Sequence, residues 1–177
     1  MTPLTPEQAH VFVHTAMMGL LKNESRTTKS VLAAVPNSNL DYRPHPHSKT
    51  ANELLRHIAA ADNFFLKSVI DGEFVPGSVA IPESIQNPAD VAEWYAETYA
   101  GNLAALGSLP AENLVKILDF RGRFQMPAYS FIQFGLVHAI HHRGQLYTLL
   151  GMLNVPTPPL YGMTATDVQA RARATEL

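Results

Sequence analysis

The chain has 177 residues, of which 46% are hydrophobic and 16% charged, and its formal net charge is −2. This composition supplies enough apolar surface to offset the chain entropy lost on folding, and the length is too short for two domains of ordinary size, so a single domain over residues 1–177 is predicted. The scattered lysines and arginines disfavour nucleic acid as a partner, and the absence of cysteine excludes disulfides and thiolate metal sites.

No window contains the run of about 18 apolar residues that a membrane span requires. The first residues, "MTPLTPEQ", also lack the basic and apolar segments of a secretory signal. The sequence therefore predicts a protein without membrane association and with a cytoplasmic location.

The first helix is predicted to begin at Thr5 and to run to about Ala34. Thr5 can cap it, Pro6 suits the first helical position and Gln8 completes a capping box. Its core-facing stripe is expected to consist of Ala9, Val13, Ala16, Met17 and Leu20.

A turn-rich segment with three prolines follows at residues 36–49, and the second helix is predicted from Thr50 to about Asp71. Thr50 and Glu53 form a second capping box, and Gly72 suits the end of the helix. The expected core stripe of this helix contains a histidine among apolar residues, namely Leu54, His57, Ile58, Ala61, Phe64 and Phe65.

Residues 73–87 are predicted to form a loop, and Asn87 and Pro88 start a third helix that ends at Gly107. Residues 108–126 are expected to be irregular, with a short strand or an extended crossover as alternatives. The fourth helix is predicted from about Pro127 to Leu153, and a short terminal helix after Thr166.

Four helices of roughly 20 to 28 residues predict an all-α fold, a four-helix bundle with long connections between the helices. Because connections of a dozen residues can run along the bundle, the loop lengths do not determine the order of the helices.

The segment "HAIHH" places His138 and His142 four residues apart, which on a helix puts both imidazoles on one face with Cβ atoms about 6 Å apart. His141 points about 100° away and is not expected to join them. The pair belongs to a stripe that the helix is expected to bury: Phe131, Phe134, Gly135, His138, His142, Gln145 and Leu149.

Two histidines one turn apart in an apolar groove are difficult to satisfy separately, whereas a shared cation satisfies both. His57 interrupts the stripe of the second helix and is the candidate third ligand. The alternative is that these are core histidines that donate to a carbonyl or a carboxylate.

The remaining histidines are predicted to lie outside the site. His10 and His14 have the same spacing as the candidate pair but lie at the edge of the first helix's stripe, and His45 and His47 lie in the proline-rich loop. No role is predicted for these four, although the loop that carries His45 and His47 could reach a site at the end of the bundle.

Residue types exclude two metal chemistries. A zinc protease of the HExxH kind has a glutamate where this chain has Ala139, and a di-iron bundle needs inward carboxylates that the fourth helix lacks. Three imidazoles leave open positions on a metal, which is the pattern of catalytic sites, and zinc, nickel, iron and copper all accept such ligands. Since histidine binds metal only when neutral, the metal is predicted to be lost as the pH falls towards and below about 6.

Three segments resemble the DinB-like (DinB/YfiT) superfamily of metal-binding four-helix bundles: "LDYRPHPHSKTANELLRHIAAADNFF", "LVHAIHHRGQLYTLL" and "PPLYG". The resemblance covers residues 40 to about 162 and rests mainly on "HxxxHRGQ" with the upstream "ELxxH". It implies a three-histidine site at His57, His138 and His142, a nickel or zinc ion, a homodimer, and in some branches thiol-dependent transferases or isomerases. No separate C-terminal domain of the mycothiol-dependent isomerases is evident.

Within the resembling motif, Arg143 is expected to face a carboxylate or solvent, and Gly144 to allow close helix approach. General-base candidates are His141, Tyr42, Asp62 and Glu97, none of which is placed near the site by spacing alone.

Two functions follow. The first is a metal-dependent enzyme, a thiol-dependent S-transferase or a hydrolase, that acts on a small molecule, with a low-molecular-weight thiol as candidate cosubstrate. The alternative is a non-catalytic, metal-stabilised bundle that acts through dimerisation or partner binding in a stress response.

Overall fold

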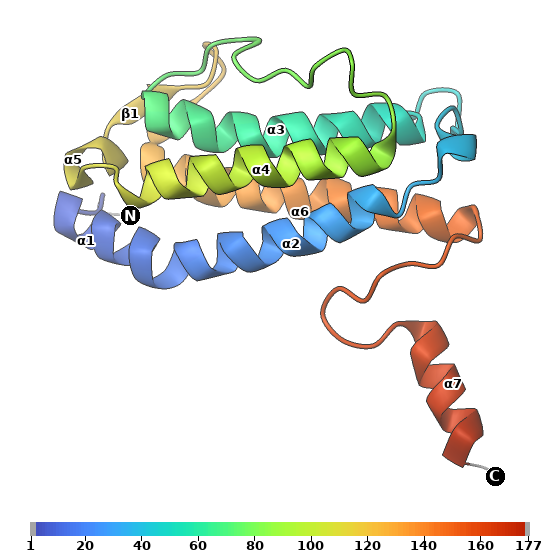
Figure 1. The fold of residues 1–177 in the computed structure, drawn as a ribbon. Coiled ribbons are helices and arrows are strands. Elements are labelled where there is room, and N and C mark those ends of the chain that lie inside the picture. The colour runs from blue at the N-terminus through green and yellow to red at the C-terminus, as the bar shows by residue number, and fades with distance from the viewer. Residues whose placement is uncertain (1–2, 176–177) are drawn as a thin grey trace.

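A computed structural model describes residues 3–175 and shows four long helical segments lying side by side (Figure 1). The first segment is a continuous rod made of α1 (Pro6–Val11), a π-helical turn (Phe12–Met17) and α2 (Met18–Ala33). The other three are α3 (Ala51–Asp71), α4 (Pro88–Gly107) and α6 (Ala128–Met152). The predicted all-α bundle is therefore confirmed.

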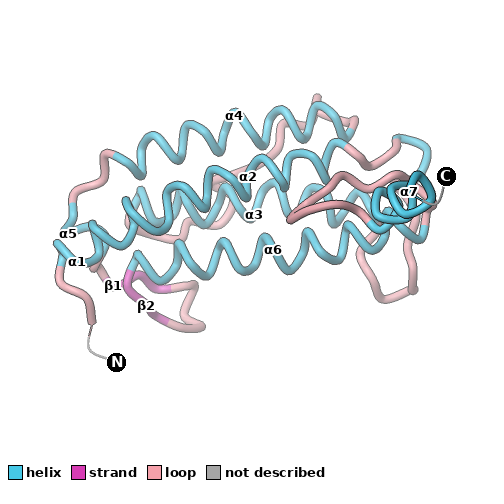
Figure 2. Tube along the Cα trace, turned by 90° about the horizontal axis from the view of Figure 1, so that it is seen from below, coloured by secondary structure: helices cyan, strands magenta, loops and turns pink. Residues whose placement is uncertain are grey.

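Smaller elements occupy the connections. A 3-10 turn (Asn37–Asn39) precedes α3, and α5 (Ala111–Leu114) follows α4. The segment predicted to be irregular also contains a small antiparallel hairpin of β1 (Ile117–Asp119) and β2 (Gln125–Pro127), which lies at the α5 end of the bundle (Figure 2). The last helix, α7 (Ala165–Thr175), projects from the bundle (Figure 1).

The predicted helix starts are confirmed by their capping geometry. Thr5 and Thr50 each form a complete capping box, and the side chain of Asn87 accepts a hydrogen bond from the Asp90 amide ahead of α4. Gly72 ends α3 with φ +82°, a left-handed conformation that glycine adopts without a steric cost.

The predicted stripe of the first helix is wrong at Ala16 and Leu20, whereas Ala9, Val13 and Met17 are buried as predicted. Ala16 and Leu20 are exposed, whereas the buried positions continue in steps of four through Met17 and Leu21. In a straight α-helix a step of four residues drifts by about 40°, and the π-helical turn at Phe12–Met17 takes up this drift. The shift in register carries Glu24 and Thr28 into the interior.

Helices α3 and α6 approach each other closely at Gly135. A Cβ atom at this position would lie 2.7 Å from the Cβ of Phe65, which no side chain tolerates without movement. Gly144, predicted to allow close helix approach, is exposed, and a Cβ there would meet no atom within 4 Å. The glycine that allows the close approach is therefore Gly135.

The predicted stripe of α6 is only partly buried. Phe131, Gly135 and Leu149 are buried, but Phe134 and Gln145 are exposed. The fully buried face of α6 is turned away from the histidines and includes Ile132, Leu136, Ala139, Arg143, Leu146 and Leu150. The histidines thus lie at the boundary between the core and solvent.

Among residues 3–175, none of the helices has both the length and the apolar character needed to cross a membrane.

Candidate metal centre

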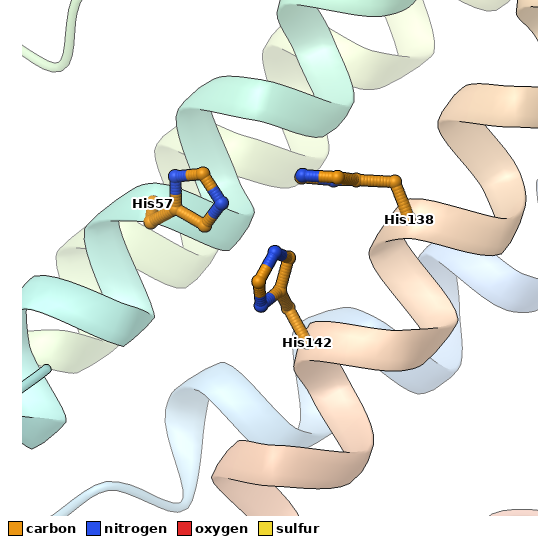
Figure 3. A group of neighbouring side chains, drawn as sticks. All are labelled: His57, His138 and His142. Atoms are coloured by element: carbon orange, nitrogen blue, oxygen red, sulfur yellow. The ribbon is translucent and has the colours of Figure 1, made fainter. Parts of the chain in front are cut away.

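His57 of α3 and the pair His138 and His142 of α6 point toward one another across the α3–α6 contact (Figure 3). One ring nitrogen from each residue lies within 4.8 Å of the other two. The ring centroids are 5.2 Å apart for His57 and His138, 4.5 Å for His57 and His142, and 4.4 Å for His138 and His142. The structure therefore brings together the three predicted ligands, while their role as ligands stays a prediction.

Burial keeps two of these imidazoles neutral. Both His57 and His138 have a pKa lowered to about 4, chiefly because burial disfavours the charged ring and secondly because His142 lies beside them. Neutral imidazole is the form that binds metal, so these two residues are ready to act as ligands at pH 7 without first losing a proton.

Gln145 holds the ring of His142. The Nδ1 atom of His142 lies 2.7 Å from Oε1 of Gln145, and Nε2 of Gln145 lies 3.1 Å from Nε2 of His141. An amide oxygen only accepts, so Nδ1 of His142 carries the proton and Nε2 keeps its lone pair free. Such a hydrogen bond to the second ring nitrogen is typical of metal-ligating histidines.

This role was missed from the sequence, where Gln145 was a residue of the buried stripe and the last residue of the "HxxxHRGQ" motif, without a predicted contact to His142. The available signal was its position three residues after His142, within hydrogen-bonding reach on one helical face. His141 is exposed, lies edge-on to the ring of His142 at 5.0 Å, and is joined to Gln145 at 3.1 Å.

Aromatic rings close the site on the side of His138. The ring of His138 lies 5.4 Å from that of Phe65 and 6.5 Å from that of Phe134. Behind them, Phe120 stacks on Phe65 and Phe124 contacts Phe134. The β1–β2 hairpin with its "FRGRF" segment therefore packs against the aromatic rings that flank His138.

A cleft of about 480 Å³ opens on the side of His142. It lies between α6, the start of α3 and the loop that precedes α3, and its lining residues are Pro44, Ser48, Lys49, Leu54, His142, Gln145, Thr148, Leu149 and Met152. A larger cavity of about 550 Å³ lies between α2 and α4, and none of the three histidines lines it.

The other histidines lie outside the cluster, as predicted. His10 is exposed and His14 half-buried, with their rings stacked at 4.1 Å and inclined by 23°. His45 and His47 are exposed in the loop before α3.

None of the predicted general bases lies in the histidine cluster. Asp62 is buried and accepts a hydrogen bond of 2.6 Å from the hydroxyl of Tyr95 on α4. Burial raises the pKa of Asp62 to about 7, against the opposing effects of that hydrogen bond and the charge of Arg143. Glu97 is exposed on α4, and Tyr42 is half-buried in the loop before α3.

A buried ion pair joins α6 to α2, on a different face of α6 from the one that carries His138 and His142. Arg143 is 1% exposed, and its guanidinium donates to the Glu24 carboxylate at 2.6 Å and to the Thr28 hydroxyl at 3.1 Å. The hydroxyl of Tyr161 donates to the same carboxylate at 2.8 Å. Of the two predicted surroundings of Arg143, a carboxylate or solvent, the structure has the carboxylate. Its partner could not be named because the π-helical turn that carries Glu24 inward is not visible in the sequence pattern.

The donor set fits one divalent ion. Three imidazoles suit zinc and nickel, and three protein ligands leave coordination positions free for a substrate or water. The buried Nδ1 of His138 has no hydrogen-bond partner among the described residues, which is not the arrangement of a histidine held in the core by hydrogen bonds alone.

Comparison with known proteins agrees with this fold. The family model described as the DinB superfamily matches residues 20–146. YjoA of Bacillus subtilis (strain 168), an uncharacterized protein, is 24% identical over 136 residues, which are 76% of this chain and 86% of YjoA.

Two crystal structures have the same overall fold. The structure of the DinB-like protein YjoA from Bacillus subtilis superposes with a TM-score of 0.69 at 21% identity, and covers 83% of this chain and 98% of its own. A DinB-like protein from Bacillus cereus gives a TM-score of 0.63 at 25% identity, with 85% and 95% covered.

Proposed function

The chain belongs to the DinB superfamily, and from this premise we propose that His57, His138 and His142 bind one divalent metal ion in a metal-dependent enzyme. The reaction is hydrolysis or the transfer of a low-molecular-weight thiol to a small molecule, and nickel or zinc is the expected metal. The observation that carries the proposal is the convergence of three ring nitrogens within 4.8 Å beside an open cleft.

The bound ion would supply Lewis-acid activation at the coordination positions that the three histidines leave free. The protein's part is to hold the ligands in place: His57 comes from α3 and the other two ligands from α6, and these helices are brought close by Gly135. Gln145 keeps the proton of His142 on Nδ1, away from the expected ligand atom.

Access to the site is one-sided. Phe65 and Phe134 cover the His138 side with apolar surface, and the cleft lies on the His142 side. A substrate therefore approaches along the cleft, while the aromatic rings limit the entry of water from the other side. The homodimer and the cytoplasmic location remain predictions.

The first test is the metal content of purified, untagged protein, measured by inductively coupled plasma mass spectrometry. About one zinc or nickel ion per chain is expected, and it should be lost in His142→Ala. The matched control is His141→Ala, which removes the neighbouring exposed imidazole and should keep the ion. Equal metal content in both variants would contradict the proposed ligand set.

Activity separates the enzyme from the non-catalytic bundle. The metal-loaded protein is assayed with ester substrates and with thiol and electrophile pairs, beside a folded His57→Ala variant. Turnover that depends on His57 supports the enzyme. A metal-loaded protein whose rates match those of His57→Ala in every assay would favour the metal-stabilised bundle.

The pH at which the metal is released gives a third measurement. Because the pKa values of His57 and His138 are about 4, protons compete with the metal at these two ligands only as the pH approaches 4. This pH is lower than the pH of about 6 at which ordinary histidines would release a metal. Protonation of His57 and His138 should therefore release the metal only below pH 6, as measured by equilibrium dialysis. Release above pH 6 would contradict the effect of burial on these two ligands.

A further inference from the structure

The cleft beside His142 has a charge pattern that metal binding does not use. Its lining contains one cationic residue, Lys49, together with Ser48 and Thr148, and none of the lining residues is acidic. The hydroxyl of Thr148 donates to the carbonyl of Gly144 at 3.0 Å. The apolar part of the lining is formed by Pro44, Leu54, Leu149 and Met152. A cation beside apolar surface is suited to an amphiphilic anion.

Lys49 has no acidic partner within 4 Å among residues 3–175. Its positive charge helps to lower the pKa of Glu53. The carboxylate of Glu53 is, however, already engaged by Arg43 at 3.3 Å and by the amide of Thr50 at 2.7 Å. The ammonium group of Lys49 is therefore free to pair with a ligand.

The backbone on both sides of Lys49 is fixed. The carbonyl of Ser48 accepts a hydrogen bond of 2.7 Å from Arg43, and the amide of Ser48 donates to the carbonyl of His45 at 2.8 Å. On the other side, Thr50 is held in the capping box of α3. The position of Lys49 is thus determined before any ligand arrives, and only its own side chain has to be ordered on binding.

Lys49 is also close to the histidine cluster. After burial and His142, its positive charge is the third cause that lowers the pKa of His57. One cation therefore acts on both the cleft and the candidate metal centre, so a single small molecule can contact both.

We propose that the cleft binds a small organic carboxylate with an apolar body. The carboxylate pairs with Lys49 next to the hydroxyl of Ser48, the body lies on Leu149 and Met152, and the remaining end reaches the side formed by His142. The assignment of this molecule as the substrate rests on the proposed metal-dependent function, whereas its binding does not.

The test uses hexanoate as the probe, titrated into metal-free and zinc-loaded protein and followed by NMR chemical shifts. Hexanoate should bind at least about tenfold more tightly than acetate, because the added methylene groups cover apolar surface. Lys49→Gln should weaken hexanoate binding about fivefold or more in both forms, and Lys49→Arg should restore it. Lys116→Gln, which removes an exposed lysine outside the cleft, should leave the affinity unchanged.

The outcomes distinguish this inference from the proposed function. If zinc binds to the histidines but hexanoate binds equally well to Lys49→Gln, the inference is overturned and the metal site stands. If hexanoate binds only to zinc-loaded protein, and without dependence on Lys49, its carboxylate is a metal ligand and the inference again fails. If no divalent ion binds but the dependence on Lys49 persists, the cleft is supported and the metal-dependent function is not.

Discussion

His142 and Arg143 are neighbours in the sequence, yet they lie on different faces of α6, about 100° apart, in contrasting surroundings. The half-buried His142 belongs to the three-histidine cluster, in which Nδ1 of His138 has no partner among the described residues. Arg143 is 1% exposed, and its guanidinium bonds to a carboxylate and two further oxygens on α2. The first arrangement leaves binding capacity for an external group, whereas the second is complete within the protein.

The difference indicates what each face contributes. The buried guanidinium of Arg143 has its hydrogen-bond partners within the protein, so it joins α6 to α2 and has no hydrogen-bonding capacity left for a ligand. A cluster of nitrogens with free lone pairs at the boundary with solvent is less favourable for the folded chain alone and gains from a cation. We therefore expect substitutions on the Arg143 face to change stability, and substitutions on the histidine face to change metal binding.

The largest expected effect is that of Arg143→Met. Without the guanidinium, the carboxylate of Glu24 is left buried and unpaired, which should lower the free energy of unfolding by about 3–5 kcal/mol. Urea unfolding followed by circular dichroism measures this loss. Lys67→Met is the control, since it breaks the exposed pair with Asp71 and should cost only about 0.5 kcal/mol. A loss below 1 kcal/mol for Arg143→Met would mean that the buried pair does not hold α6 in place.

On the histidine face, Gln145→Leu should weaken zinc binding by about 10-fold to 100-fold, because His142 loses the hydrogen bond that fixes its protonated nitrogen. The exposed position of Gln145 predicts little change in stability. Competition with a chromogenic chelator measures the affinity. Gln133→Leu, at another exposed position on α6, serves as control, and equal affinity in the two variants would show that Gln145 does not orient the ligand.

Asp62, which is buried on α3, makes the free energy of unfolding depend on pH. Its pKa of about 7 lies above the value of the unfolded chain, so the folded state favours the protonated form and loses stability as the pH rises through 7. The groups around it are Tyr95 and Tyr99 on α4, Glu24 on α2 and Arg143 on α6.

The free energy of unfolding of the wild type should therefore fall by about 1 kcal/mol between pH 6 and pH 8 relative to Asp62→Asn. Parallel urea titrations at the two pH values measure the difference. Identical pH dependence in both proteins would place the ionisation of Asp62 outside this range.

The smallest expected effect is that of Tyr161→Phe. The hydroxyl donates to Glu24, but the residue is 70% exposed and Arg143 continues to neutralise the carboxylate, so the loss should be about 0.5–1 kcal/mol. Thermal unfolding is sensitive enough to detect it. A loss as large as that of Arg143→Met would make Tyr161 an essential member of the buried pair.

Much of the architecture could be predicted from local signals. The capping boxes at Thr5 and Thr50 and the start at Asn87 depend on residues three positions apart, so the chain displays them directly. The spacing of His138 and His142 likewise determines that they share a face of α6. His57 could be chosen because a polar residue in an apolar stripe needs a partner, and the structure places it beside that pair.

What failed was the assignment of faces. The π-helical turn changes which residues after Met17 face the core, so that Leu20 is exposed and Glu24 is buried. The residue types in "FVHTAM" do not predict such a turn. The close-approach glycine was misplaced for a related reason, since the fit at Gly135 depends on Phe65 of another helix. Both errors concern which residues of a helix face its neighbours, not where the helices begin and end.

The sequence by itself therefore determined the helices, their ends and the histidines that share a face, because these depend on hydrogen bonds and periodicity within a few residues. Only the tertiary structure decided that His57 meets His138 and His142, that Glu24 faces Arg143, and that Lys49 stands beside the cleft. The residues that meet at these places are separated by dozens of positions or more in the sequence. Their positions in space follow from how α2, α3 and α6 pack. Packing of that kind is a property of the whole core and is not encoded in any short segment.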